Sequence, residues 1–382
     1  MYKYQCLNPI SSAGLDNFPE NYVKAEEGEA AEIILVRSAK MHEMEFDKDL
    51  LCIARAGAGV NNIPLERAAS EGIVVFNTPG ANANGVKELF VFAAIASVRD
   101  IIGGIEWTRS EAGNPDIAAL TEKEKKKFVG NEVLGKKLGV IGLGAIGARV
   151  ANVAVSLGMT VTGYDAFFND NMKAALDPAV KITESLDEIA LNDMITIHVP
   201  ATGDTKGMIN ADFLAKARDG VIVINLARDS LVNEADMKAA LENGKVRKYV
   251  CDFPTQGASE MPNTILIPHL GASTDESEDN CAVMAVQEVR DFIENGNIKN
   301  SVNYPAASLG ALKGTRACVA HKSSVTGLDI ANVIKGLKID ISDMISKTRG
   351  DTAYSMFDIS KADKVKEALE ASDGVLKVRI LQ

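Results

Sequence analysis

The sequence predicts an α/β protein with a doubly wound parallel sheet of the Rossmann type and a small ferredoxin-like α+β domain at its end. Short apolar strands alternate with helical patterns through most of the chain, and a glycine-rich turn follows the strand 137–141. Residues 315–382 read strand, helix, strand, strand, helix, strand, which is the order of a split βαβ unit. With 382 residues, 46% of them apolar, the chain is long enough for two or three domains.

Composition argues against several classes of protein. A net charge of −11 does not suit a nucleic-acid-binding face. The five cysteines are scattered and form no C-x-x-C pair, so we expect neither a metal site nor a disulfide framework. We find no signal peptide and no apolar stretch of the roughly 18 residues that a membrane helix needs. These features predict a cytoplasmic protein without nucleic-acid or membrane partners.

The strands fall into two blocks before residue 300. In the first block, the apolar runs 32–36 and 72–76 predict buried parallel strands, and residues 86–102 have a helical period. In the second block we expect strands at 137–141, 159–164, 194–199, 220–225, 247–252 and 264–267. A long helix should then run from a cap at Ser273 or Thr274 to Asn295.

The turn after the strand 137–141 has the pattern of a dinucleotide site. Gly142 allows a tight turn, Gly144 lets the backbone approach a pyrophosphate, and Gly147 lets helix and strand pack closely. Asp165 ends the next strand, where a carboxylate binds ribose hydroxyls and repels a 2′-phosphate. The pattern therefore favours NAD over NADP; the alternative is that Asp165 only caps its loop.

Two side chains with the chemistry of hydroxy-acid oxidation follow strands of the second block. Arg228 follows the strand 220–225, and its guanidinium suits a carboxylate. His269 follows the strand 264–267, and its imidazole suits proton transfer at neutral pH. Ligands bind beyond the carboxyl ends of such strands, so both are candidate catalytic residues, although either could be structural.

The first block offers basic residues for a phosphate group. Arg55 precedes a glycine-rich turn in which the backbone N–H groups near Ala58 and Gly59 could hold a carboxylate. Arg37 and Lys40 follow the strand 32–36. The alternative for all three basic side chains is that they are simply solvated.

The residues 142–147, 165, 198–200, 225–228 and 268–271 together resemble the D-isomer-specific 2-hydroxyacid dehydrogenases over essentially the whole chain. Segments 55–63 and 77–84 resemble the phosphoglycerate dehydrogenase branch. The resemblance implies a flavodoxin-like substrate domain, and it makes Arg228 the catalytic arginine and His269 the catalytic histidine. It also implies a substrate contact at Asn82 and NAD contacts at Ala145, Ile146, His198, Val199, Pro200, Thr205, Leu226, Ala227, Asp252 and Gly271.

The implied function is oxidation of D-3-phosphoglycerate to 3-phosphohydroxypyruvate with NAD, the first step of serine synthesis. The phosphorylated 2-hydroxy acid is expected in a cleft between the domains. One alternative is a dehydrogenase for another D-2-hydroxy acid, such as glycerate or lactate. A second alternative, from a different class, is a NAD-sensing interaction protein, because fold does not dictate function.

The chain departs from the family pattern at two positions. Asp229 stands where a glycine usually follows the arginine, and it could weaken substrate binding unless it points to solvent. Gln256 falls in the place of the glutamate that hydrogen-bonds the catalytic histidine, with Glu260 as a less suitable alternative. Without that negative charge, the histidine pKa should be lower than in glutamate-bearing relatives.

The C-terminal part resembles the ACT regulatory domain. The resemblance implies a homo-oligomer and serine as an effector, with His321, Ser323 and Asp340 at the ligand positions. We therefore expect a substrate-binding domain at 1–97 and 280–302, a NAD-binding domain at 98–279, a linker at 303–314 and the ACT-like domain at 315–382.

Overall fold

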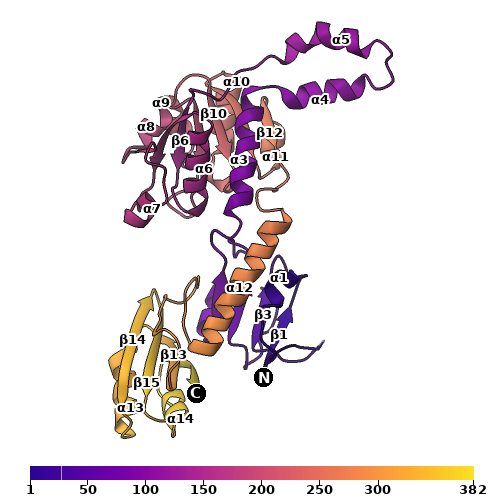
Figure 1. Ribbon diagram of the computed structural model, residues 1–382. Helices are drawn as coiled ribbons and strands as arrows, with labels where there is room; N and C mark the ends of the chain where they lie inside the picture. The colour runs from indigo at the N-terminus through magenta and orange to yellow at the C-terminus, as the bar shows by residue number, and fades with distance from the viewer. Residues whose placement is uncertain (27) are drawn as a thin grey trace. The chain divides into compact units, whose positions relative to one another are not determined.

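The computed structural model describes residues 1–26 and 28–382, and its chain forms two compact units (Figure 1). The first unit consists of residues 1–82 and 275–382, and the second of residues 83–274. The unit boundaries thus lie at the start of helix α3 (Ala83–Val98) and of helix α12 (Asp275–Asn295). The C-terminal domain, residues 315–382, belongs to the first unit.

The N-terminal part of the first unit is a parallel sheet of five strands in the order β2-β1-β3-β4-β5. These strands are β1 (Tyr2–Cys6), β2 (Tyr22–Lys24), β3 (Ile33–Val36), β4 (Cys52–Arg55) and β5 (Val74–Asn77). Strand β3 is buried on both faces: Ile33 and Leu35 pack toward α12, while Ile34 and Val36 pack toward α2 (Leu65–Ser70). This two-sided burial explains why the strand is a continuous apolar run.

The C-terminal domain is an antiparallel sheet in the order β14-β15-β13-β16 with two helices on one face, which confirms the predicted α+β arrangement. Its elements are β13 (Thr315–Lys322), α13 (Gly327–Gly336), β14 (Ile341–Arg349), β15 (Thr352–Ile359), α14 (Val365–Glu370) and β16 (Val375–Leu381). The opposite face packs against α12: Cys318, Tyr354 and Met356 share one apolar cluster with Val289 and Phe292. The sheet is therefore covered on both sides.

The second unit is a parallel sheet of seven strands in the order β12-β11-β10-β9-β6-β7-β8, and it confirms the predicted doubly wound sheet. The strands are β6 (Lys137–Ile141), β7 (Thr160–Tyr164), β8 (Lys181–Ile182), β9 (Met194–Ile197), β10 (Val221–Asn225), β11 (Val246–Cys251) and β12 (Thr264–Leu266). Strand order reverses between β6 and β9, and ligands of such sheets bind beyond the carboxyl ends of the strands at that point.

Helices cover both faces of this sheet. Helices α3 and α6 (Ala145–Ser156) pack on one face. The other face is covered by α8 (Leu186–Ala190), α9 (Ala211–Lys216) and α10 (Glu234–Glu242), and α7 (Asp170–Ala174) and α11 (Gln256–Ser259) are short. In the described residues no helix is long and apolar enough to cross a membrane, and no three His, Cys, Asp or Glu side chains gather as metal ligands.

A helical hairpin leaves the second unit. It consists of α4 (Ile101–Ser110), α5 (Ile117–Glu124) and the 3₁₀ turn η1 (Lys125–Phe128), and it extends away from the sheet in Figure 1. None of its residues is buried. The one packed contact between aromatic rings in it joins Trp107 to Phe128, with centroids 5.9 Å apart. The sequence predicted a single helix over 86–102; the break occurs where the Asp100 carboxylate accepts a hydrogen bond from the Gly103 N–H and begins α4.

A buried carboxyl group on α12 makes the stability of the first unit depend on pH. Glu288 is 6% exposed; Asn300 donates one hydrogen bond to its Oε1 at 2.5 Å, and Oε2 has no partner in the described chain. Burial raises the pKa of Glu288 from 4.5 to about 7. As pH rises through this window, the unfolded carboxyl ionises before the folded one, so the folded state loses stability.

We therefore expect Glu288→Gln to stabilise the protein above pH 7 by on the order of 2 kcal/mol and to have little effect below pH 4.5. Urea unfolding followed by circular dichroism across this range measures the difference. Glu276→Gln, at an exposed position of the same helix, is the matched control and should show no such dependence on pH. Equal gains for both variants at every pH would contradict the assignment.

Candidate active site

The glycine-rich turn joins β6 to α6, and its three glycines have different roles. Gly142 has a φ of +91°, and a Cβ there would lie 2.6 Å from the carbonyl oxygen of His198. A Cβ on Gly147 would lie 1.8 Å from the Gly142 carbonyl oxygen, so any larger residue would separate helix and strand. The Cβ position of Gly144 has no other part of the described chain within 4 Å. The turn thus leaves open space against bare backbone at the start of α6, with Ala145 and Ile146 in its first turn.

Asp165 follows β7 and lies beside this turn. Its Oδ2 accepts a hydrogen bond from the Leu143 N–H at 2.8 Å, and its Oδ1 accepts one from the Phe167 N–H at 2.8 Å. The carboxylate therefore caps its own loop and also contacts the turn. Each oxygen keeps a further lone pair, so the arrangement is compatible with binding ribose hydroxyls as well.

His198 follows β9 and is a neutral side chain. Its Nε2 lies 2.9 Å from the Thr196 hydroxyl, whereas Nδ1 is buried and has no hydrogen-bond partner in the described residues. Burial lowers the pKa of His198 to about 3. A buried nitrogen without a partner is costly in an isolated protein, so this atom is suited to a ligand group.

The loop after His198 is held by its own polar groups. Thr205 donates a hydrogen bond from its hydroxyl to the Pro200 carbonyl at 2.6 Å and accepts one from the Thr202 N–H at 2.8 Å. The Val199 side chain lies at the turn, since a Cβ on Gly142 would come within 2.8 Å of its Cγ1. These residues lie on the same rim of the sheet as Gly144.

Arg228 lies in a loop that Asn225 fixes at the end of β10. The Asn225 side chain is fully buried; its amide donates to the Arg228 carbonyl at 2.8 Å and its Oδ1 accepts from the Ala227 N–H at 3.1 Å. The Arg228 Nη1 donates to the Ala227 carbonyl at 2.6 Å, and Leu226 is buried beneath the loop. In the described chain Arg228 has no carboxylate partner, so its charge is available to an anion.

Phe253 brings the two candidate catalytic side chains together. The Arg228 Cζ lies 5.5 Å from the centroid of the Phe253 ring, and the His269 ring lies against the same ring with a centroid distance of 4.6 Å. The three residues follow the adjacent strands β10, β11 and β12. An arginine and a histidine thus share one aromatic contact at the carboxyl edge of the sheet, as their positions after parallel strands predicted.

The His269 backbone has a rare conformation that Asp252 stabilises. His269 has a φ of +56°, in the left-handed region that a non-glycine residue adopts at a cost of order 1 kcal/mol. The next two N–H groups, of Leu270 and Gly271, each donate to the buried Asp252 carboxylate at 2.8 Å. Burial raises the pKa of Asp252 and these two hydrogen bonds oppose the rise. Asp252 therefore anchors the loop that presents His269, whereas the resemblance implied a NAD contact for it.

The substrate residues expected in the first block gather at the carboxyl edge of the five-stranded sheet. The Arg55 Nε donates to the Arg37 carbonyl at 3.0 Å, and its guanidinium covers Gly57, whose φ is +151°. The loop beyond is fixed by the Asn77 amide, which donates to the Ala58 carbonyl at 2.6 Å. The turn that includes Gly59 therefore has a defined position next to Arg55.

The other three expected substrate residues differ in their surroundings. Arg37 forms an ion pair with Glu278 of α12, so its charge is compensated within the first unit. Lys40 is exposed. The Asn82 Oδ1 is buried and has no hydrogen-bond partner in the described residues, which suits a ligand contact. Asn82 thus offers an unpartnered polar atom to a ligand, whereas the charge of Arg37 is already compensated.

Comparison with known proteins identifies the type of the NAD-binding domain. Residues 91–271 match the model of the D-isomer specific 2-hydroxyacid dehydrogenase, NAD binding domain. They contain the glycine turn, Asp165, Arg228 and His269. These residues therefore form a NAD-binding domain of the D-isomer-specific 2-hydroxyacid dehydrogenase type.

Individual members of the family extend this match. The chain is 34% identical to the D-3-phosphoglycerate dehydrogenase of Bacillus subtilis over 78% of its length and 56% of that protein, and 32% identical to the one of Archaeoglobus fulgidus over 80% and 60%. It therefore spans about three-fifths or less of these relatives. A 3-phosphoglycerate dehydrogenase of Entamoeba histolytica with bound NAD⁺ is similar in structure, with a TM-score of 0.60 and 25% identity over 79% of this chain and 98% of that one.

The two departures from the pattern of these dehydrogenases have different structural outcomes. Asp229 is exposed and forms no ion pair with Arg228 in the described chain, so it does not neutralise the arginine. Gln256 is exposed at the start of α11, and its side-chain amide makes no hydrogen bond to His269. Glu260, the alternative, lies 3.9 Å from the Lys238 Nζ. No carboxylate is hydrogen-bonded to the His269 ring among the described residues.

The three residues expected at an effector site are not brought together in the described structure. His321 is fully buried, and its ring nitrogens lie 2.8 Å from the Ser355 hydroxyl and 3.0 Å from the Lys322 carbonyl. A side chain with both nitrogens satisfied inside a sheet is a core residue. Asp340 precedes β14 at the opposite end of the sheet, six positions along β15 from the partner of His321, or roughly 20 Å.

Three residues that shape the candidate site were not predicted. Phe253 joins Arg228 to His269, Asn225 fixes the arginine loop, and Glu278 neutralises Arg37. A signal existed only for Asn225, a polar residue that ends an apolar strand. The other two contacts form between segments that are distant in the sequence.

Proposed function

We propose that this chain oxidises D-3-phosphoglycerate to 3-phosphohydroxypyruvate with NAD, which is the first step of L-serine biosynthesis. The observation that supports this most is the contact of Arg228 and His269 with one phenylalanine, at the same edge of the sheet as an open glycine turn. A guanidinium without a carboxylate partner in the described chain and an exposed imidazole, both at the carboxyl edge of a doubly wound sheet, suit a hydroxy acid. The curated relatives that are 32–34% identical are phosphoglycerate dehydrogenases.

The residues of the second unit fit NAD. The pyrophosphate would lie against Gly144 and the N-terminus of α6, where the Cβ position is open. Asp165 would accept hydrogen bonds from the ribose hydroxyls, and its charge disfavours a 2′-phosphate. The unpartnered Nδ1 of His198 would receive a polar group of the cofactor. When bound, the nicotinamide supplies the acceptor for the hydride that leaves C2 of the substrate.

Side chains of this chain bind the substrate and transfer its proton. Arg228 binds the carboxylate of the hydroxy acid and orients C2. The His269 imidazole accepts the hydroxyl proton at one of its ring nitrogens, and the product is then a ketone. Asp252 keeps the His269 loop in its left-handed conformation throughout. Arg55 of the first unit is the residue that we assign to the phosphate group.

Consumption of NADH by the purified protein with 3-phosphohydroxypyruvate, hydroxypyruvate and pyruvate at equal concentrations tests the substrate. Preference for the phosphorylated compound supports the proposal, and Arg55→Met should remove that preference while activity on hydroxypyruvate persists. Activity restricted to unphosphorylated acids would identify a dehydrogenase for another D-2-hydroxy acid. No activity on any compound, with NADH still bound, would contradict an enzymatic role and support a NAD-sensing protein.

The missing glutamate gives a prediction about pH. We propose that residue 256 approaches His269 when the substrate is bound, so we expect Gln256→Glu to raise the apparent pKa of kcat/KM. A profile of kcat/KM against pH for both proteins measures the shift. Lys238→Met is the control variant. It removes the cation that lies 3.9 Å from Glu260, and it should leave the profile of kcat/KM against pH unchanged. An unchanged profile in Gln256→Glu would show that residue 256 does not approach His269.

We further propose that the protein is a homo-oligomer. Nine-residue β14 is an edge strand with no outer neighbour in the described sheet, and the α4–α5 hairpin has no buried residue although it contains Trp107, Ile101 and Ile105. Such surfaces suit contacts with a second copy. Light scattering coupled to size exclusion should give a multiple of 40.7 kDa. A mass of 40.7 kDa at micromolar concentration would contradict this proposal.

The remaining parts of the proposal concern location and regulation. The five cysteines are all unpaired, which favours a reducing cytoplasm. Serine remains a candidate effector as the end product of the pathway. His321 is not available for it in this chain because the residue is buried.

A further inference from the structure

A short segment after α12 extends the five-stranded sheet of the first unit. Residues 300–302 lie antiparallel to the end of β5, which is the last strand of that sheet. The Asn77 N–H donates to the Asn300 carbonyl at 3.3 Å. The Val302 N–H donates to the Val75 carbonyl at 2.9 Å. The segment therefore covers the outer edge of β5 and contacts the point at which this strand ends.

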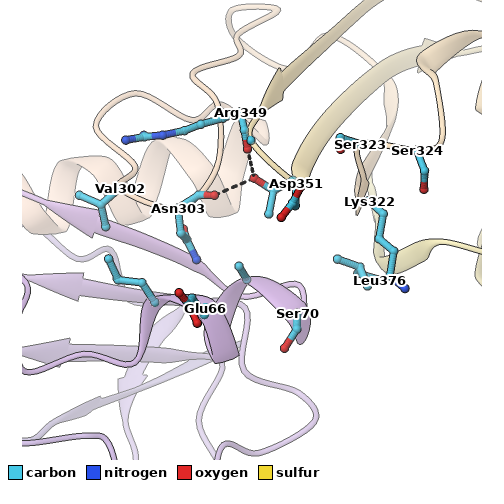
Figure 2. Close-up of a pocket in the computed structure, with 14 residues that line it drawn as sticks. Glu66, Ser70, Val302, Asn303, Lys322, Ser323, Ser324, Arg349, Asp351 and Leu376 are labelled. Carbon is cyan, nitrogen blue, oxygen red and sulfur yellow. Dashed lines mark hydrogen bonds between the residues drawn. The ribbon is translucent and has the colours of Figure 1, made fainter. Parts of the chain in front are cut away.

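The far end of this segment is held by its own contacts. The Asn303 side chain is bonded to β5: its Oδ1 accepts from the Val75 N–H at 2.8 Å and its amide donates to the Ile73 carbonyl at 2.9 Å. The Asn303 carbonyl accepts from the Thr352 hydroxyl at 2.8 Å, beside a pocket of about 590 Å³ between α2 and the C-terminal domain (Figure 2). The position of the near end, at Asn300, depends on other contacts.

Glu288 of α12 holds the near end. The Asn300 side-chain amide donates to its Oε1 at 2.5 Å. Helix α12 is itself fixed against the sheet, where the Phe292 ring packs on Phe76 with centroids 5.6 Å apart. Glu288 is buried, and its Oε2 has no hydrogen-bond partner among the described residues. Because such a group lowers stability, a contribution to folding does not account for an acid at this position.

The end of β5 in turn holds the loop 56–59, next to Arg55. The Asn77 side-chain amide donates to the Ala58 carbonyl at 2.6 Å. The Thr78 N–H donates to the Gly57 carbonyl at 3.1 Å. The backbone of this loop is the part of the first unit that we expect to contact the hydroxy acid, so its position is set by the residue that ends β5.

We propose that Glu288 is a positioning residue for the loop 56–59. Three successive hydrogen bonds join it to that loop: Glu288 to Asn300, Asn300 to Asn77, and Asn77 to Ala58. All four residues belong to the first unit. A loop that binds the hydroxy acid equally in the ground state and the transition state affects KM, whereas kcat is nearly unchanged when it moves. The kinetic part of this inference rests on the proposed function.

The structural part is tested on the full-length protein without substrate or cofactor. Hydrogen exchange followed by mass spectrometry measures the peptide 56–63, in which the N–H groups of Ala56 and Ile63 are hydrogen-bonded. Glu288→Leu removes the acceptor for the Asn300 amide and should accelerate exchange of this peptide roughly fivefold or more. Glu288→Gln keeps an acceptor there and should exchange like the unmodified protein.

A matched pair of asparagine variants separates this effect from a general loosening of the first unit. Asn300→Ala removes the same bond from the other side, at a position that is only partly buried, and should accelerate exchange as Glu288→Leu does. Asn297→Ala is the control, because the buried Asn297 amide donates to Asp291 and to the Gly310 carbonyl, away from β5. The proposal is overturned if exchange of the peptide 56–63 is unchanged in Asn300→Ala or in folded Glu288→Leu, or if Asn297→Ala accelerates it equally.

Steady-state kinetics of the same variants tests the effect on the substrate. KM for D-3-phosphoglycerate should rise roughly fivefold or more in Glu288→Leu and Asn300→Ala, with kcat within about twofold. Glu288→Gln and Asn297→Ala should keep the KM of the unmodified protein. Faster exchange without a change in KM, or a lower kcat at unchanged KM, would overturn the assignment to substrate binding. Absence of dehydrogenase activity in the unmodified protein would instead contradict the proposed function, and the hydrogen-exchange result would be unaffected.

Discussion

Replacing His269 by asparagine should lower kcat/KM for the phosphorylated substrate by roughly 10²–10⁴-fold, because the group that accepts the hydroxyl proton in oxidation and donates it in reduction is lost. Asparagine is the appropriate replacement since it tolerates the left-handed backbone, with a φ of +56°, better than alanine does. The N–H groups of Leu270 and Gly271 then keep their bonds to Asp252. Steady-state kinetics with 3-phosphohydroxypyruvate and NADH measures the loss.

The dissociation constant of NADH, followed by its fluorescence, should remain unchanged in this variant, because the glycine turn and Asp165 do not contact the imidazole. His42→Asn is the matched control: His42 is an exposed histidine whose ring Nε2 donates one hydrogen bond to the Asn61 carbonyl. It should leave kcat/KM unchanged. If His269→Asn retained full activity, another group would have to accept the proton and the assigned mechanism would be wrong.

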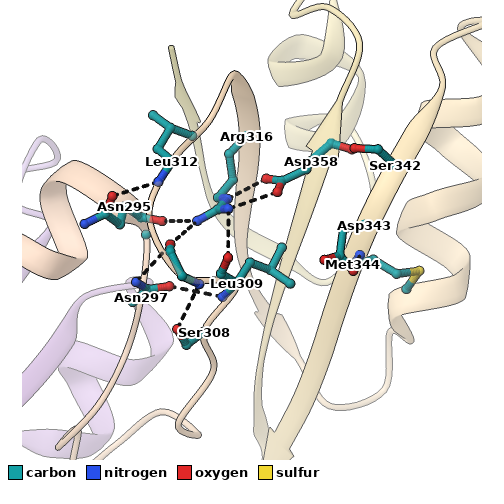
Figure 3. A network of polar contacts seen from close by, with 12 residues as sticks. Asn295, Asn297, Ser308, Leu309, Leu312, Arg316, Ser342, Asp343, Met344 and Asp358 are labelled. Atoms are coloured by element: carbon teal, nitrogen blue, oxygen red, sulfur yellow. Dashed lines mark hydrogen bonds and ion pairs between the residues drawn. The ribbon is translucent and has the colours of Figure 1, made fainter.

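Arg316→Met should destabilise the first unit by about 1–3 kcal/mol, because it removes the hydrogen bonds of a buried guanidinium and leaves the partly exposed carboxylate of Asp358 without its partner. The Arg316 side chain is 1% exposed. Its guanidinium donates to both oxygens of Asp358, at 2.5 and 2.9 Å, and to the carbonyls of Asn295 and Gly310, at 2.8 and 2.9 Å (Figure 3). It thus links the end of α12, the segment before β13 and the C-terminal sheet.

Urea unfolding followed by circular dichroism measures the effect of Arg316→Met. Lys322→Met, at the exposed end of the same strand, is the control and should change stability by less than about 0.5 kcal/mol. The double variant Arg316→Met/Asp358→Leu should recover part of the loss, since it removes both charges. A double variant as unstable as the single one would mean that the carbonyl contacts, and not the ion pair, account for the stability.

The sequence by itself determined the order of the elements and the parts of the site that are local. Gly142, Gly144 and Gly147 lie within six consecutive residues, so their roles follow from backbone geometry alone. The doubly wound sheet followed from apolar runs separated by helical patterns. Arg228 and His269 were placed on one edge because parallel strands end on the same side of a sheet. The C-terminal domain was predicted from the order of its elements, because the periodicity of its sequence changes between strand and helix in the order of a split βαβ unit.

Only the tertiary structure decided which side chains these elements bring into contact. The ring of Phe253 joins Arg228 to His269, and Glu278 neutralises Arg37 although 241 positions separate them. His321 was expected to contact a ligand, but its strand places it inside the sheet against Ser355. The pocket between α2 and the C-terminal domain is lined by residues from several segments that are far apart in the sequence. Each of these depends on how distant segments pack, and a local pattern of residue types does not encode that packing.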